Sequence, residues 1–119
     1  MIRGSRFIFL GVACLFVICI TTQILIAGMA VFTDSSYWQN HIVFVRVFEL
    51  FPIVMLILSF TGKLPNFLRW MSVVILILIF AQYFTANFEG AGAAHPVIAA
   101  ILFWVSIVVA VHAKRSVFT

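Results

Sequence analysis

Two histidines stand at matching places in a chain that is otherwise very apolar. His41 follows "YWQN" at the start of one apolar segment, and His95 starts another in "GAGAAHPVIAA". Histidine is a standard axial ligand of haem iron and the commonest ligand of other metals. The two residues therefore predict a cofactor site, provided that the fold brings both imidazoles to one level and turns them toward each other.

The composition places this pair of histidines in a membrane protein. Of the 119 residues, 66% are hydrophobic and only 8% are charged, against roughly 25% charged residues in a soluble domain. A chain with so few charges cannot cover a surface that faces water, so lipid must surround it. We expect residues 1–119 to form one small integral membrane domain within the lipid bilayer.

Four apolar segments are long enough to cross the bilayer as helices, since about 20 residues span roughly 30 Å of hydrocarbon. The first segment follows Arg3 and Arg6, as a secretory signal would, but it is too long for one and we expect it to be retained. Short connections favour antiparallel packing of consecutive helices. The sequence predicts an all-α protein, an up-down-up-down bundle of four transmembrane helices at about 7–32, 42–60, 67–86 and 95–113.

The charges predict how this bundle sits in the membrane. If the helices alternate in direction, Asp34 and Glu89 fall at one end of the bundle. The opposite end of the bundle then contains six positively charged residues, Arg3, Arg6, Lys63, Arg69, Lys114 and Arg115. Because Lys and Arg are enriched in cytoplasmic loops, both termini are expected in the cytoplasm. The net charge of +4 reflects this orientation, and no basic stripe indicates a nucleic-acid partner.

The same topology places the two histidines together near the outer face. The second and fourth helices are diagonal and run in the same direction, so His41 and His95 share one level of the membrane. Helical periodicity puts Ala99 and Ser106 below His95, and such small residues mark a packing face. Both imidazoles are therefore predicted to point inward, although each one alone is equally explained as an interfacial residue, and Pro96 as a helix starter.

Distance favours haem over a small metal ion at this level. Neighbouring helix axes lie roughly 8–10 Å apart, so diagonal axes lie about 11–14 Å apart. That spacing suits a haem b with one imidazole on each face, whereas zinc would need further ligands. No CxxCH attachment motif is present, so the haem would be bound without a covalent link. His112, at the cytoplasmic end, is expected to have an interfacial role.

Two charged residues lie well inside the second helix. Arg46 and Glu49 are three residues apart and can pair along the helix, and Arg46 lies about 7 Å deeper than His41 at 1.5 Å per residue. Charges at this depth are costly, which makes them functional candidates. They form either a polar site, for a proton path, a quinone or a haem carboxylate, or a self-neutralised pair that hydrogen-bonds to Gln82 or Tyr83.

The stretch "NHIVFVRVFELFPIVMLILSFTGKLP", followed by "HPVIAAILFW", resembles a family of small four-helix bacterial membrane proteins without known activity. This resemblance implies a bacterial cytoplasmic membrane protein. The layout is also similar to one half of haem A synthase, whose four-helix units carry histidines at the outer ends of their second and fourth helices. His41 and His95 match those positions. That family has a glutamate and often an arginine where Trp38 and Ile42 stand here, which puts its oxidation chemistry in doubt.

Three functions remain open at this point. The first is a b-type haem protein that uses His41 and His95 in electron transfer or haem handling, with a membrane quinone or another redox protein as its partner. The second is a cofactor-free accessory or scaffold subunit, whose small-residue faces bind another membrane protein. The third is a small-molecule transporter, which with four helices per chain would work as a homo-oligomer.

Overall fold

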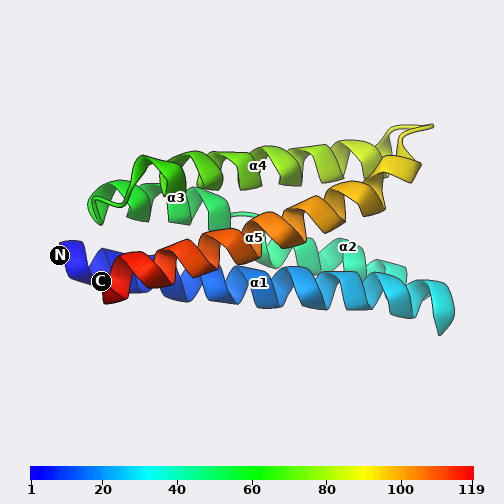
Figure 1. Cartoon of the computed structure of the whole chain (residues 1–119). Helices are drawn as coiled ribbons and strands as arrows, with labels where there is room; N and C mark the ends of the chain where they lie inside the picture. The colour runs from blue at the N-terminus through cyan, green and yellow to red at the C-terminus, as the bar shows by residue number, and fades with distance from the viewer.

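The computed structural model, which describes all residues 1–119, is entirely helical and contains no strand. Figure 1 shows long helices side by side, with both chain termini at the same end. The helices are α1 (Ile2–Phe32), α2 (Tyr37–Phe48), α3 (Phe51–Thr61), α4 (Asn66–Asn87), the 3-10 helix η1 (Gly92–Ala94) and α5 (His95–Phe118).

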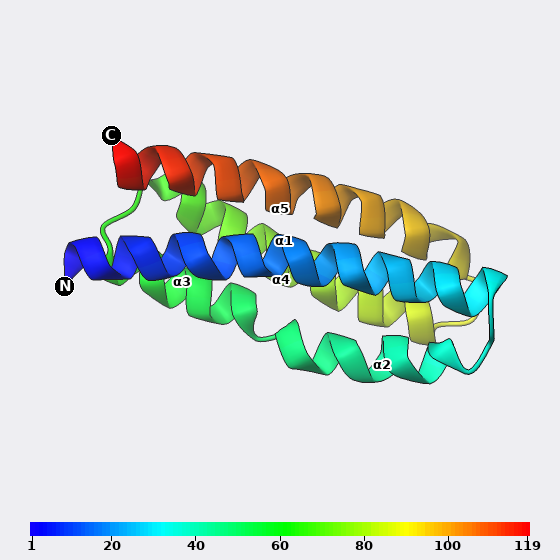
Figure 2. The ribbon, with the colours of Figure 1, turned by 90° about the horizontal axis from the view of Figure 1, so that it is seen from below.

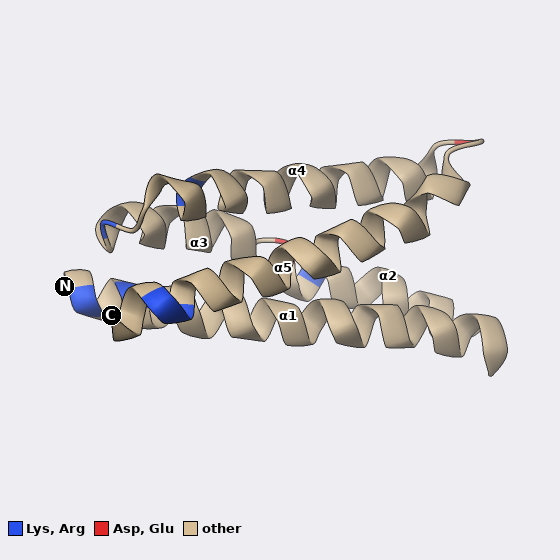
Figure 3. Ribbon diagram, in the orientation of Figure 1, with Lys and Arg blue, Asp and Glu red and all other residues tan.

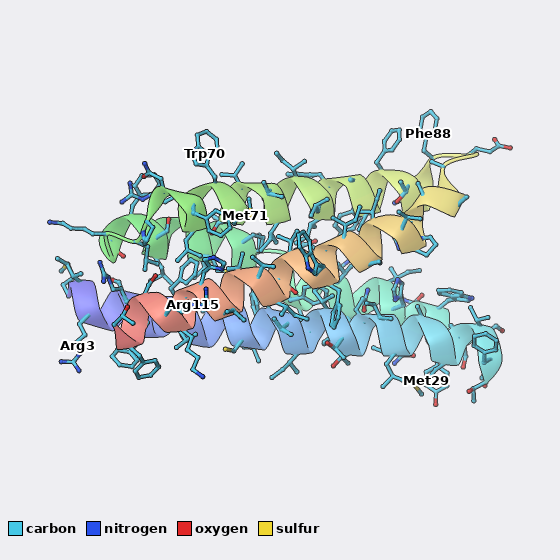
Figure 4. The ribbon with its side chains drawn as sticks, viewed as in Figure 1. Arg3, Met29, Trp70, Met71, Phe88 and Arg115 are labelled. Carbon is cyan, nitrogen blue, oxygen red and sulfur yellow. The ribbon has the colours of Figure 1, made fainter.

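The predicted class of fold is confirmed. Four helical spans are long and apolar enough to cross a membrane: Ile2–Phe32, Tyr37–Thr61, Asn66–Asn87 and Gly92–Phe118. The large apolar side chains on the outside support the same conclusion, because in lipid they need no cover. Trp70 is 68% exposed and Phe88 is 60% exposed, and Figure 4 shows both rings pointing away from the bundle. The chain is a multi-pass membrane protein.

The second span differs from the single helix at about 42–60 that the hydropathy predicted. It begins earlier, at Tyr37, and it is divided into α2 and α3 by a break at Glu49 and Leu50. Pro52 lies in the first turn of α3, where it is tolerated because the N–H that proline lacks has no helical partner there. The hydrogen-bond ladder of α2 therefore cannot continue unbroken through Pro52, and Figure 2 shows the two helices offset at this point.

The core lies along one face of α1, which runs through the whole bundle. Phe9, Ala13, Phe16 and Ile20 recur at helical spacing on this face and are all buried, as expected for an inward apolar stripe. α1 packs extensively on α2, α3 and α5, and α4 packs on α3 and α5. The second and fourth spans are thus diagonal, and α2 makes no extensive contact with α4 or α5.

The end of the bundle that holds the termini is tied together by Arg6. Its guanidinium donates to the carbonyl oxygens of Gly62 (2.7 Å), Lys63 (3.0 Å) and Ser116 (3.4 Å). A Cβ atom at Gly62 would lie 3.2 Å from Cγ of Arg6, so the glycine allows α1 to approach this closely. Figure 3 shows most Lys and Arg residues at this same end, in agreement with the predicted clustering of positive charge.

Candidate histidine site

A cavity of about 320 Å³ occupies the half of the bundle away from the chain termini, between α1, α2, α4 and α5. It exists because α2 diverges from α4 and α5 while remaining packed on α1. Its walls include polar residues from all four helices. Its floor is formed by four buried apolar side chains, Ile20, Phe48, Ile79 and Leu102. The site is therefore closed by apolar side chains toward the half of the bundle that holds the termini.

The structure brings His41 and His95 together in this cavity, at the level that the topology predicted. Their ring centroids lie 6.2 Å apart, with an angle of 67° between the ring planes. Both residues line the cavity and both are partly buried. Trp38, one turn before His41, covers that imidazole edge-on with its ring centroid 5.7 Å away.

A backbone carbonyl on the preceding helix holds each imidazole. Nδ1 of His41 lies 3.2 Å from the carbonyl oxygen of Gln23, and Nδ1 of His95 lies 3.1 Å from that of Gln82. The Thr85 hydroxyl oxygen is also 3.0 Å from Nδ1 of His95. A carbonyl oxygen only accepts hydrogen bonds, so each of these carbonyl contacts requires the neutral tautomer that carries its hydrogen on Nδ1. Nε2 of each ring then carries a free lone pair and has no partner in the protein.

The two glutamines play equivalent parts, and the sequence analysis missed the role of both. Besides its carbonyl contact with the histidine ring, Gln23 donates from Nε2 to the carbonyl oxygen of His41 at 2.7 Å. The Oε1 atoms of Gln23 and Gln82 are buried without a hydrogen-bond partner, and both residues line the cavity.

The charged residues of the second span combine parts of the two expectations, because Glu49 is bonded to Tyr83 and Arg46 lines a polar cavity. Tyr83 of α4 donates a hydrogen bond from its hydroxyl to Oε2 of Glu49, so Glu49 is held across the bundle and not by its helix neighbour. Arg46 lines the cavity together with Gln82 and Tyr83, and no acidic side chain pairs with it. The hydrogen bond from Tyr83 to Glu49 joins the break between α2 and α3 to α4, below the level of the histidines.

His112 is remote from the cavity. Its Nδ1 lies 2.9 Å from the carbonyl oxygen of Val108, one turn earlier on α5, and its ring packs on Phe67 with centroids 4.7 Å apart. No group of three or more His, Cys, Asp or Glu side chains lies together anywhere in the structure. A small metal ion held between His41 and His95 would thus have only two such protein ligands.

A protein family of unknown function, DUF6220, matches residues 23–91 of the chain. The matched segment contains Gln23, His41, Glu49 and Tyr83, and it ends before His95. No curated protein and no solved structure matches the chain, so the likeness to haem A synthase has no support from these comparisons. The expected kinship with a small membrane protein family of unknown activity is confirmed. Since the match covers more than half of its residues, the chain belongs to the DUF6220 family.

Proposed function

We propose that this protein binds one b-type haem between His41 and His95 and serves in electron transfer or haem handling. The observation that carries the proposal is the 6.2 Å separation of the two ring centroids. Two imidazoles on opposite sides of one metal, with metal–nitrogen bonds of about 2.0–2.1 Å, hold their centroids about 6–6.5 Å apart. The spacing of these rings therefore suits two axial ligands of a single iron.

The hydrogen bonds at Nδ1 support the same assignment. A histidine that ligates a metal nearly always donates its other ring N–H to a carboxylate, a carbonyl or water, which fixes the tautomer and the ring orientation. His41 and His95 both meet a carbonyl oxygen in this way.

The cavity also suits a large planar ligand. Its volume of about 320 Å³ lies at the lower end for small-molecule sites, but the side between α2 and α4 is not closed by helix packing. A porphyrin can therefore extend through this opening into surrounding lipid. The apolar floor of Ile20, Phe48, Ile79 and Leu102 matches its hydrophobic face.

The orientation of the chain follows from its charges. Six Lys and Arg residues are expected at the end that holds the termini, and Asp34 and Glu89 lie in the loops at the other end. We propose that both termini lie in the cytoplasm of a bacterial cell, because the cytoplasmic segments of membrane proteins carry an excess of positive charge. The histidines then lie near the outer face of the cytoplasmic membrane.

When bound, the haem supplies a one-electron redox centre. The residues of the chain bind and orient it: the carbonyls of Gln23 and Gln82 hold the imidazoles, Trp38 packs over His41, and the floor excludes water from the inner half. The partner we propose is a membrane quinone, because the open side of the cavity faces lipid. The acceptor atoms Oε1 of Gln23 and Gln82 favour the reduced quinol form of this partner, because a quinol carries hydroxyl donors and a quinone does not.

The test is titration of haem into the detergent-purified protein, with His41→Ala, His95→Ala and His112→Ala compared with the wild type. We expect one haem per chain in the wild type and in His112→Ala, and loss of the six-coordinate spectrum in each of the other variants. A double variant, His41→Ala with His95→Ala, that retains the wild-type spectrum would contradict the proposal. His112→Ala controls for haem that binds loosely to apolar surface.

A further inference from the structure

The cavity is lined by one cationic side chain that forms no ion pair within the protein. Arg46 lies in α2 and lines the cavity together with His41 and His95. Glu49, the acidic residue nearest to it in sequence, accepts its hydrogen bond from Tyr83. The two other acidic residues, Asp34 and Glu89, lie in the loops at the outer end. Arg46 therefore has no carboxylate partner within the chain.

An arginine without a partner at this depth needs an explanation. Arg46 follows His41 by five residues, which places it about 7.5 Å deeper at 1.5 Å per residue along the helix. Arginine stays charged in proteins, and a charge in the hydrocarbon region is costly unless it is paired or faces a polar cavity. Arg46 lines the cavity and its side chain is exposed, so an anionic group of a ligand in the cavity can reach the guanidinium.

The distribution of the other charges makes Arg46 the one cation available to such a group. The outer loops carry Asp34 and Glu89 and contain no Lys or Arg, so they repel an anion at the mouth of the cavity. All other Lys and Arg residues precede Phe7 or lie in the segments 63–69 and 114–115, at the opposite end of the bundle. The neutral walls, including Gln23 and Gln82, offer no second positive charge.

We infer that the guanidinium of Arg46 binds a carboxylate of the ligand that His41 and His95 hold. The inference rests on the proposed function, because the carboxylates in question are the two propionate groups of haem b. A guanidinium presents two parallel N–H donors that match the two oxygens of a carboxylate. Arg46 would thereby hold one carboxylate of the ligand and help to orient it relative to His41 and His95.

The experiment compares haem b with haem b dimethyl ester, whose propionates are uncharged. Each is titrated into detergent-purified wild type, Arg46→Gln and Arg46→Lys, and its Kd is read from the absorption change. We expect Arg46→Gln to weaken the binding of haem b about 10- to 100-fold, the usual range for a lost hydrogen bond to a charged group. The ester should bind the wild type and Arg46→Gln with equal affinity, and Arg46→Lys should restore part of the affinity for haem b.

The outcomes separate this inference from the proposed function. If the wild type binds haem b and its ester equally well, and Arg46→Gln changes neither Kd, then Arg46 does not hold a carboxylate while the histidine site stands. If the wild type binds neither compound, both the histidine site and the role of Arg46 are wrong. Arg46 makes no hydrogen bond to the rest of the chain, so Arg46→Gln is expected to fold, which retention of the wild-type circular dichroism spectrum checks.

Discussion

Replacement of Arg6 by methionine should destabilise the bundle much more than the same replacement of Arg3. Arg6 is partly buried and its guanidinium joins three elements, since it bonds to Gly62 and Lys63 after α3 and to Ser116 near the end of α5. Arg3 is exposed and makes only a distant contact with the ring of Phe7, at 5.9 Å. Both replacements remove one positive charge from the same end of the chain, so their effects on orientation are matched.

The expected loss of stability in Arg6→Met follows from the hydrogen bonds that the replacement removes. A hydrogen bond to a charged group contributes about 1.5–3 kcal/mol. The bond to Gly62 is short and partly buried, the bond to Lys63 is exposed, and the bond to Ser116 is long at 3.4 Å. Only the first should count in full, because water replaces much of the other two. We expect Arg6→Met to lower the free energy of unfolding by about 2–3 kcal/mol.

The assay is equilibrium unfolding in mixed micelles of a mild detergent and sodium dodecyl sulfate, followed by circular dichroism. Arg3→Met should stay within about 0.5 kcal/mol of the wild type, as surface replacements usually do. Equal unfolding curves for the Arg6 and Arg3 variants would refute the reasoning, because Arg6 would then not connect the helices at this end.

Two further changes test other parts of the fold. Lys63 has a φ of 49°, a left-handed conformation that costs an ordinary residue about 1–2 kcal/mol and glycine almost nothing. The variant Lys63→Gly should therefore be about 1 kcal/mol more stable than Lys63→Ala in the same unfolding assay. Equal stability of the two variants would show that the backbone is not strained at this position. In a double-mutant cycle, Tyr83→Phe and Glu49→Leu should couple by about 1 kcal/mol, because each change removes the hydrogen bond between the two side chains. Strictly additive effects would show that the contact does not contribute to stability.

Much of the fold could be predicted from the sequence because hydropathy is a strong signal over 20 residues. The apolar runs and the polar connections marked four spans, and their short connections marked antiparallel neighbours. The break at Glu49 and Leu50 was missed, since its cause, Pro52, lies inside an apolar run that otherwise reads as one continuous helix. A proline in the first turn of a new helix and a proline inside a long one look alike in a single sequence.

The candidate site could be predicted only in part. The shared level of His41 and His95 follows from the number and direction of the helices, and the structure places the two rings 6.2 Å apart. The contacts of Gln23 and Gln82 with these rings are between a side chain and a backbone carbonyl, which no residue pattern encodes. Local spacing suggested a pair between Arg46 and Glu49, whereas the bond from Tyr83 depends on how α2 and α4 approach each other.

The absorption spectrum of the wild-type protein, purified in mild detergent from cells supplied with haem, tests the central claim most directly. We predict a Soret band at one haem per chain, with the spectrum of a six-coordinate iron in both the oxidised and the dithionite-reduced protein. Carbon monoxide should leave the reduced spectrum unchanged, since both axial positions are taken by His41 and His95. A colourless protein that remains colourless after titration with haem would contradict the account.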